Sequence, residues 1–172
     1  NVNLPIISEN NSLTNSYAYT YYNELYEENI SKVSFFVRSA NSLTGDNVKL
    51  SERIFLPARK LRGFGSGTVG PKDGNDFIGG NYAASMNLST TLPQVLPNSQ
   101  NLDVLMFMDV ANIWGVDYDS SLDDTNKIRS SVGLGIDWFT VVGPLTISIA
   151  HPITKVDSDK TEAFKFNLGT TF

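Results

Sequence analysis

Apolar and polar residues alternate with a period of two along most of the chain, which indicates β-strands rather than helices. In the last segment, 162–172, large apolar residues recur at every second position: Phe164, Phe166, Leu168 and Phe172. The positions between them are small or polar, and Gly169 is one of them. This segment is the clearest strand of the chain.

The same alternation predicts a series of strands before it, in segments 16–27, 31–43, 81–93, 102–115, 127–140 and 143–152. Residues 1–8 are interpreted as the end of a further strand. Soluble strands usually have about 5 to 6 residues, whereas tilted membrane-spanning strands need roughly 9 to 11, which is nearer to these segments. One face of each is apolar and the other is rich in Ser, Asn, Thr, Gly and Ala. We therefore expect an all-β, antiparallel transmembrane barrel of which this chain supplies seven or eight strands. A soluble β-sandwich is the alternative.

The links between the predicted strands are alternately long and short, as in outer-membrane barrels, whose periplasmic turns are short and extracellular loops long. The long links are 45–79, 115–126 and 153–162, and the short ones are 28–31 and 141–143. The link at 93–101 is longer than a typical turn. This alternation predicts a C-terminus on the periplasmic side and an extracellular or lumen-folded loop at 45–79.

Composition narrows the chemistry. The 172 residues include no cysteine, which excludes disulfides, zinc fingers and thiol nucleophiles, and no apolar run approaches the ~18 residues of a transmembrane helix. Lys and Arg number 13 against 18 Asp and Glu, giving a net charge of −5 that argues against a nucleic-acid partner. Because the chain begins at Asn1 inside a strand-like segment, we expect a processed chain or a fragment.

The loop 65–70 matches G-x-G-x-x-G, the spacing of a dinucleotide-binding loop. That fingerprint follows a buried strand and opens a helix, whereas three basic residues precede this match and proline with further glycines follows it. A glycine-rich loop that packs against a wall fits better, so no nucleotide cofactor is expected.

Two further motifs are candidates for a metal or a catalytic site. Asp117, Asp119, Ser121 and Asp123 resemble the start of a calcium loop, but Leu122 replaces the turn glycine and the bidentate glutamate is missing. A solvated acidic loop is the favoured interpretation, and no metal site is expected. His151, the sole histidine, has no ligand or triad partner at a suitable spacing. We therefore expect no enzyme.

Several motifs together resemble the BamA family, the outer-membrane β-barrel assembly factors of the bacterial surface antigen superfamily. They are "LRGF" (61–64), "GPKD" (70–73), "GGN" (79–81), "MDVANIW" (108–114), "RSSVGLGIDWFTVVGPL" (129–145) and "FKFNLGTTF" (164–172). They occur in family order, whereas residues 1–60 match by strand pattern alone. The resemblance implies the C-terminal part, residues 1–172, of a sixteen-stranded barrel whose N-terminal half and periplasmic POTRA domains lie outside this chain.

The resemblance also implies a clamp between the long loop and the lumen wall. The family's R-G-F motif falls on Arg62, Gly63 and Phe64, and its acidic lumen partner falls on Asp109. A second acidic partner of the family corresponds to Ser89, which carries no charge. On physical grounds a carboxylate inside a barrel needs a partner, and a guanidinium can pair with it through two hydrogen bonds. We expect Arg62 and Asp109 to pair, with glycines 63, 65 and 67 lying close to the wall.

The function implied by the resemblance is assembly of outer-membrane β-barrel proteins by strand pairing at a lateral gate. The terminal strand, with Phe164, Phe166, Leu168, Gly169 and Phe172, would expose its edge to an incoming strand. The expected partners are unfolded outer-membrane proteins, accessory lipoproteins and the lipid bilayer of a bacterial outer membrane. Two alternatives stay open: a polypeptide-transporting barrel of the same superfamily, and a small closed eight-stranded structural barrel.

Overall fold

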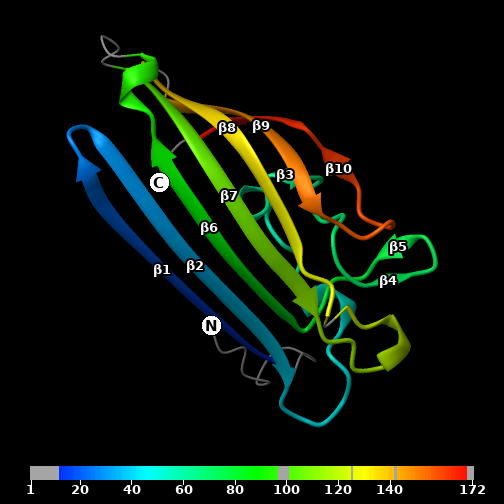
Figure 1. The fold of residues 1–172 in the computed structure, drawn as a ribbon. Helices are drawn as coiled ribbons and strands as arrows, with labels where there is room; N and C mark the ends of the chain where they lie inside the picture. The colour runs from blue at the N-terminus through cyan, green and yellow to red at the C-terminus, as the bar shows by residue number, and fades with distance from the viewer. Residues whose placement is uncertain (1–11, 97–100, 125, 142, 170–172) are drawn as a thin grey trace.

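A seven-stranded antiparallel sheet, with neighbours in the order β1-β2-β6-β7-β8-β9-β11, dominates the computed structural model (Figure 1). The structure describes residues 12–96, 101–124, 126–141 and 143–169. The strands are β1 (Ser12–Tyr26), β2 (Asn29–Ser42), β6 (Tyr82–Thr91), β7 (Leu102–Trp114), β8 (Arg129–Thr140), β9 (Gly143–Thr154) and β11 (Phe164–Leu168). The predicted antiparallel strands are therefore confirmed. The possible strand at 1–8 and the terminal Phe172 lie outside the described residues.

Short elements occupy the links between these strands. Two-residue strands are β3 (Gly63–Phe64), β4 (Lys72–Asp73), β5 (Asp76–Phe77) and β10 (Thr161–Glu162). Three-residue 3₁₀ turns are η1 (Leu50–Glu52), η2 (Ala58–Lys60), η3 (Pro93–Val95) and η4 (Ser120–Leu122). Within the described ranges, none of these turns has the length and apolar character needed to cross a membrane.

The sheet is curved but open. Over the described residues β1 pairs only with β2, and β11 pairs only with β9, so the two edge strands do not meet. Figure 1 shows β1 and β9–β10 at opposite sides of the curved wall. The described strands thus form part of a wall and not the closed eight-stranded barrel that the sequence left open.

The long connections gather at one end of the sheet and the short ones at the other. Residues 43–81, 115–128 and 155–163 link strands at what we call the loop end, and the tight links 27–28 and 141–142 lie at the turn end. The long loop, expected at 45–79, therefore spans 43–81. At the turn end, the 92–101 connection begins with Leu92, which directly precedes η3 and whose N–H donates to Val104 O of β7 at 2.7 Å.

The two faces of the sheet differ as the alternation predicts. We call the face covered by the 43–81 loop the inner face and the opposite face the outer face. Outer side chains are apolar and exposed, as shown by Met106 (49% exposed), Leu134 (58%) and Ile149 (63%). Inner side chains of the same strands are buried and often polar, such as Asp109 and Ser131, both 0% exposed. This is the arrangement of a wall with lipid outside and a polar lumen inside.

The main core lies between the 43–81 loop and the inner face, at the loop end. Loop residues Val48, Ile54, Leu56, Leu61, Phe64 and Val69 form one buried cluster with Ala40, Ala83, Ala111 and Ile113 of the wall. Small side chains on β2, β6 and β7 leave room for the larger loop residues. Apolar burial of this kind contributes to holding the loop against the wall.

Candidate functional site

Arg62 of the long loop and Asp109 of β7 form a two-pronged ion pair on the inner face. Arg62 Nε donates to Asp109 Oδ2 and Arg62 Nη2 donates to Oδ1, each at 2.7 Å. The backbone N–H of Arg62 also donates to Oδ2, at 3.0 Å. Asp109 is placed inward because the outer positions of β7 are taken by residues such as Met108. The expected contact between Arg62 and Asp109 is therefore formed.

Two more side chains complete the site. Asn87 of β6, directly opposite Asp109 in the strand pairing, donates through Nδ2 to Asp109 Oδ1 at 2.9 Å. Its Nδ2 also donates to the carbonyl of Lys60, at 2.9 Å, so it contacts the wall and the loop together. Phe107 lies under the guanidinium, with the Arg62 Cζ 3.4 Å from the ring centroid. Such stacking suits a planar guanidinium.

Glycine at two positions makes room for this arrangement. Gly63 has φ of +88°, and a Cβ there would lie 3.1 Å from Ala150 Cβ, so the loop backbone lies against β9. Gly133 of β8 leaves space for the Phe107 ring, because a Cβ would lie 2.5 Å from its edge. Ser131 Oγ donates to the carbonyl of Arg62 and fixes the loop from the β8 side. Phe64 is 1% exposed, as expected for a residue wedged beside the wall.

The expectation for the other two glycines was wrong. A Cβ on Gly65 would meet Thr68 first, and a Cβ on Gly67 would approach only Phe55, both within the loop itself. The second close approach to the wall is instead made by Gly70, with φ of +109° and an added Cβ 3.1 Å from Ile113 Cβ. The glycines of the G-x-G-x-x-G match therefore have different structural roles.

Asn87 is the residue that the sequence argument missed. The resemblance points to Ser89 as the position of the family's second acid, but Ser89 pairs with Phe107 rather than with Asp109. The sequence shows that Asn87 is on the polar face of its strand. It does not show the β6–β7 register, which decides which polar residue faces Asp109.

The acidic loop between β7 and β8 is not merely solvated, which corrects the favoured interpretation. Asp117 Oδ1 accepts a hydrogen bond from Arg53 Nη2 at 2.7 Å, and Asp117 Oδ2 accepts one from the N–H of Val48 at 2.6 Å. Burial raises the pKa of Asp117, but hydrogen bonds from Val48 N–H and Asn81, with the charge of Arg53, lower it more, so its pKa lies below the ordinary value. Asp117 thereby anchors the beginning of the long loop.

A second buried ion cluster joins the β7–β8 link to the 155–163 link at the loop end. Arg129, at the start of β8, is 0% exposed and contacts Asp124 and Asp159, the latter through Nε–Oδ2 at 3.0 Å. Asp124 lies in the β7–β8 link and Asp159 in the link before β10. Among the described residues, no group of three or more His, Cys, Asp or Glu side chains is arranged to hold a metal ion.

The terminal strand lies where the sequence places it, at an edge of the sheet. Phe164 (56% exposed), Phe166 (54%) and Leu168 (59%) are on the outer face. Gly169 continues the pairing through its N–H, which donates to Pro144 O at 2.9 Å. Lys165, between the two phenylalanines, points inward and is 8% exposed.

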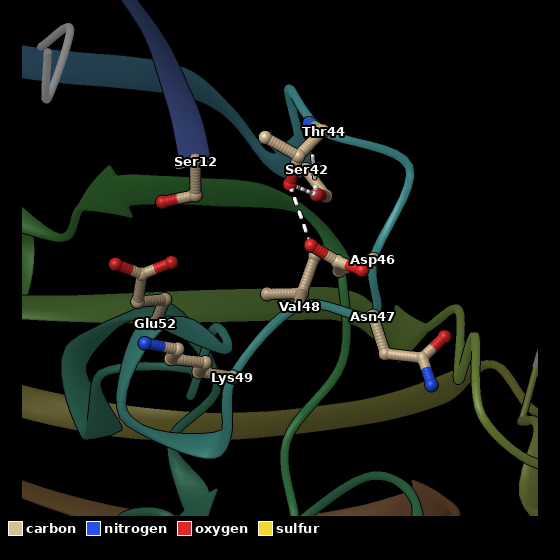
Figure 2. Close-up of a pocket in the computed structure, with 8 residues that line it drawn as sticks. All are labelled: Ser12, Ser42, Thr44, Asp46, Asn47, Val48, Lys49 and Glu52. Carbon is tan, nitrogen blue, oxygen red and sulfur yellow. Dashed lines mark hydrogen bonds between the residues drawn. The ribbon is translucent and has the colours of Figure 1, made fainter. Parts of the chain in front are cut away.

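A small polar cavity of about 50 Å³ lies away from this site, between the start of β1 and residues 42–52 (Figure 2). Figure 2 shows Thr44, which donates to Asp46 Oδ2 at 2.8 Å, beside Ser42. The buried Ser12 Oγ and Glu52 Oε1, which also line it, have no hydrogen-bond partner in the described structure. The cavity is the size of one or two water molecules.

Comparison with known proteins shows which family the chain matches. The Omp85 superfamily domain matches residues 1–172. The outer membrane protein assembly factor BamA of Neorickettsia risticii (strain Illinois) is 30% identical over 145 residues, which cover 81% of this chain and 19% of that protein. The protein of the same name from Neisseria meningitidis serogroup B is 28% identical over 139 residues, covering 65% of this chain and 17% of that protein.

A solved structure shows the same fold. The crystal structure of BamA from Haemophilus ducreyi lacking POTRA domains 1-3 matches with a TM-score of 0.86 at 26% identity, covering 95% of this chain and 35% of that one. The chain spans about a fifth of the length of the two curated relatives. Because the superfamily domain matches residues 1–172 of the chain, the chain belongs to the Omp85 superfamily, in which it resembles the C-terminal part of the BamA barrel.

Proposed function

We propose that this chain is the part of an outer-membrane assembly factor that presents a strand edge to incoming β-barrel proteins. The observation that carries the proposal is the terminal strand β11, which pairs with β9 on one side and has no partner on the other among the described residues. An unpaired edge is a template for a further strand. The two curated relatives are named as outer membrane protein assembly factors, which supports this use of the edge.

The geometry of β11 indicates which backbone groups would do the templating. Ala150 N donates to Ala163 O at 2.8 Å, and Gly169 N donates to Pro144 O at 2.9 Å, so odd-numbered residues bond to β9. In an antiparallel pair the residues between them direct their N–H and C=O groups to the other side. Phe164, Phe166 and Leu168 therefore offer their backbone groups to an incoming strand, and their side chains to lipid.

The Arg62–Asp109 pair supports the edge indirectly in this proposal. It holds the 43–81 loop on the inner face, and the loop in turn contacts β8, β9 and the segment before β11. A wall braced in this way keeps β9 in place while β11 changes partners. Strand pairing makes and breaks hydrogen bonds only, so the proposed activity is not enzymatic.

The membrane location in this proposal rests on the faces of the sheet, and the partners rest on the relatives, which are named outer membrane protein assembly factors. The apolar outer face suits the hydrocarbon of a bacterial outer membrane, with the turn end and the C-terminus toward the periplasm. The substrates would be unfolded outer-membrane proteins. The upstream half of the barrel, its POTRA domains and accessory lipoproteins would complete the machine. A polypeptide-transporting barrel is the second candidate of the same superfamily, but the loop packed over the inner face gives no specific support for an open conduit.

The proposal is tested by removing one edge donor. Phe166→Pro in the full-length protein, reconstituted in liposomes, deletes an N–H that faces the free edge. We expect assembly of an added unfolded barrel protein, measured by its heat-modifiable mobility on a gel, to fall at least tenfold. Phe166→Ala, which removes the ring and keeps the N–H, is the matched control and should retain most activity. Equal activity of the proline and alanine variants, with both folded, would reject edge templating by β11.

A further inference from the structure

The loop that carries Arg62 is bonded directly to the segment that begins the terminal strand. Strand β3 pairs with β10, placing Phe64 opposite Thr161 and Gly63 opposite Glu162. The ladder continues through Gly65 N to Lys160 O at 2.9 Å and Lys160 N to Thr68 O at 3.2 Å. The chain then leaves the loop at Ala163 and joins β9. One continuous segment, 160–168, is therefore shared between the loop and the barrel wall.

Lys165 adds a side-chain bond across this junction. It lies between two residues that face outward, and its own side chain is 9% exposed on the inner face. Its Nζ donates to the backbone carbonyl of Phe64 at 2.9 Å and contacts Glu162 Oε2 at 3.3 Å. The Phe64 carbonyl belongs to the R-G-F motif itself. The contact thus joins β11 to Phe64, which lies two residues after Arg62, the partner of Asp109.

The β11–β9 pairing is short, so the hydrogen bond from Lys165 to the Phe64 carbonyl matters for how firmly β11 is held. Within the described residues, five residue pairs, from Phe164–Ile149 to Leu168–Leu145, and one further hydrogen bond at each end connect the two strands, although β9 runs over twelve residues. A strand held by few ladder bonds opens easily. A hydrogen bond from a charged, buried donor is about twice as strong as a neutral one, so it contributes a large share of the hold on so short a strand.

We infer that Lys165 is a positioning residue that couples the seating of the 43–81 loop to the attachment of the terminal strand. When the loop is clamped by Asp109, the Phe64 carbonyl is presented to Lys165 and β11 is held inward at its start. When the loop shifts, the acceptor leaves, and β11 is released from one of its holds. Coupling of this kind is reciprocal: releasing the strand must loosen the loop by the same factor. The inference rests on the proposed function only in treating β11 as the strand that changes partners.

Hydrogen exchange in the full-length protein, in lipid and without substrate, tests the coupling. We expect Lys165→Met to raise the exchange rate of amides in residues 164–169 about tenfold, the effect of losing one hydrogen bond from a charged donor. It should also raise the exchange of the Gly65 amide, in the loop. Lys165→Arg, which keeps a cationic donor, should restore both. Lys160→Met, an exposed lysine of the same segment, is the matched control and should change neither.

The reverse experiment breaks the Arg62–Asp109 pair and measures its effect on β11. Arg62→Met should raise exchange in residues 164–169, and in the Lys165→Met background it should add little, because the two changes break one pathway. Faster exchange of β11 with an unchanged loop, or full additivity of the two substitutions, would show that Lys165 only stabilises its own strand and would overturn the inference. Since no substrate is present, failure here leaves the Phe166→Pro assembly test intact, and failure of that test leaves this one intact.

Discussion

At the scale of single residues, the site depends on a buried carboxylate with every oxygen engaged. Asp109 is 0% exposed and accepts hydrogen bonds from Arg62 and Asn87, and the Phe107 ring supports the guanidinium. Replacing one partner of a buried pair leaves an uncompensated charge, which typically costs about 3–5 kcal/mol. The pairing of Arg62 with Asp109 was expected because the family resemblance marks both positions and a buried carboxylate needs a partner. Asn87 could not, because its role is set by strand register rather than by residue type.

Gly63 offers a residue-scale prediction about the close approach of loop and wall. Gly63→Ala should lower the midpoint of heat-induced unfolding of the full-length protein, followed by gel mobility, because an alanine at φ of +88° is strained and its Cβ meets Ala150. Gly45 has a similar φ of +82° with open space around it, so Gly45→Ala carries the strain alone, about 1–2 kcal/mol. We expect the larger loss for Gly63→Ala. Equal losses would show that contact with β9 is unimportant.

At the scale of elements, the strands could be predicted and their partners only in part. Alternation in β7 placed Met108 outward and Asp109 inward, because a half-buried strand must separate its faces. The same alternation located β11. It carried no information on the internal path of the 43–81 loop, where β3 pairs with β10 across about a hundred residues of sequence. Those contacts come from glycine geometry and apolar packing that have no periodic signature.

The β6–β7 register gives a prediction for Asn87. Asn87→Ala removes the donor to both Asp109 and the Lys60 carbonyl, and should destabilise the folded state by about 1–2 kcal/mol. Ser85, on the same face of β6, has a buried hydroxyl without a hydrogen-bond partner in the described structure, so Ser85→Ala should be neutral or stabilising. Urea titration of gel mobility measures both. An Asn87→Ala protein as stable as Ser85→Ala would contradict the role assigned to Asn87.

The attachment of the long loop through Asp117 should depend on pH. The pKa of Asp117 is held below its ordinary value of 3.8 in the folded state, so its contribution to stability is present above that value and disappears as the pH falls through the folded pKa. Acid should therefore expose the loop beginning at Val48 to added protease, with a midpoint below pH 4. Asp117→Asn should give the exposed loop already at neutral pH. Acid sensitivity unchanged by Asp117→Asn would assign the effect to another carboxyl group.

At the scale of the whole molecule, the wall and the loop form one braced unit with an open edge. The sequence predicted the seven strands that the structure describes and, apart from the 92–101 connection, the alternation of long and short links, because each follows from local patterns. Closure could not be predicted from this chain, since it depends on strands that lie outside it. The consequence for function is that β11 sits at the boundary between this wall and whatever strand it next pairs with.

The most direct test of strand templating by β11 is to trap a substrate on the free edge of this strand. The chain has no cysteine, so Asn167→Cys in the full-length protein can be paired with single cysteines placed along the last strand of a barrel substrate during assembly in liposomes. We predict a disulfide at one substrate residue, the one that lies opposite residue 167 in a single register, and none at its immediate neighbours, whose side chains point to the other face. Efficient assembly without such cross-links, or cross-links spread evenly over all positions, would contradict templating by β11.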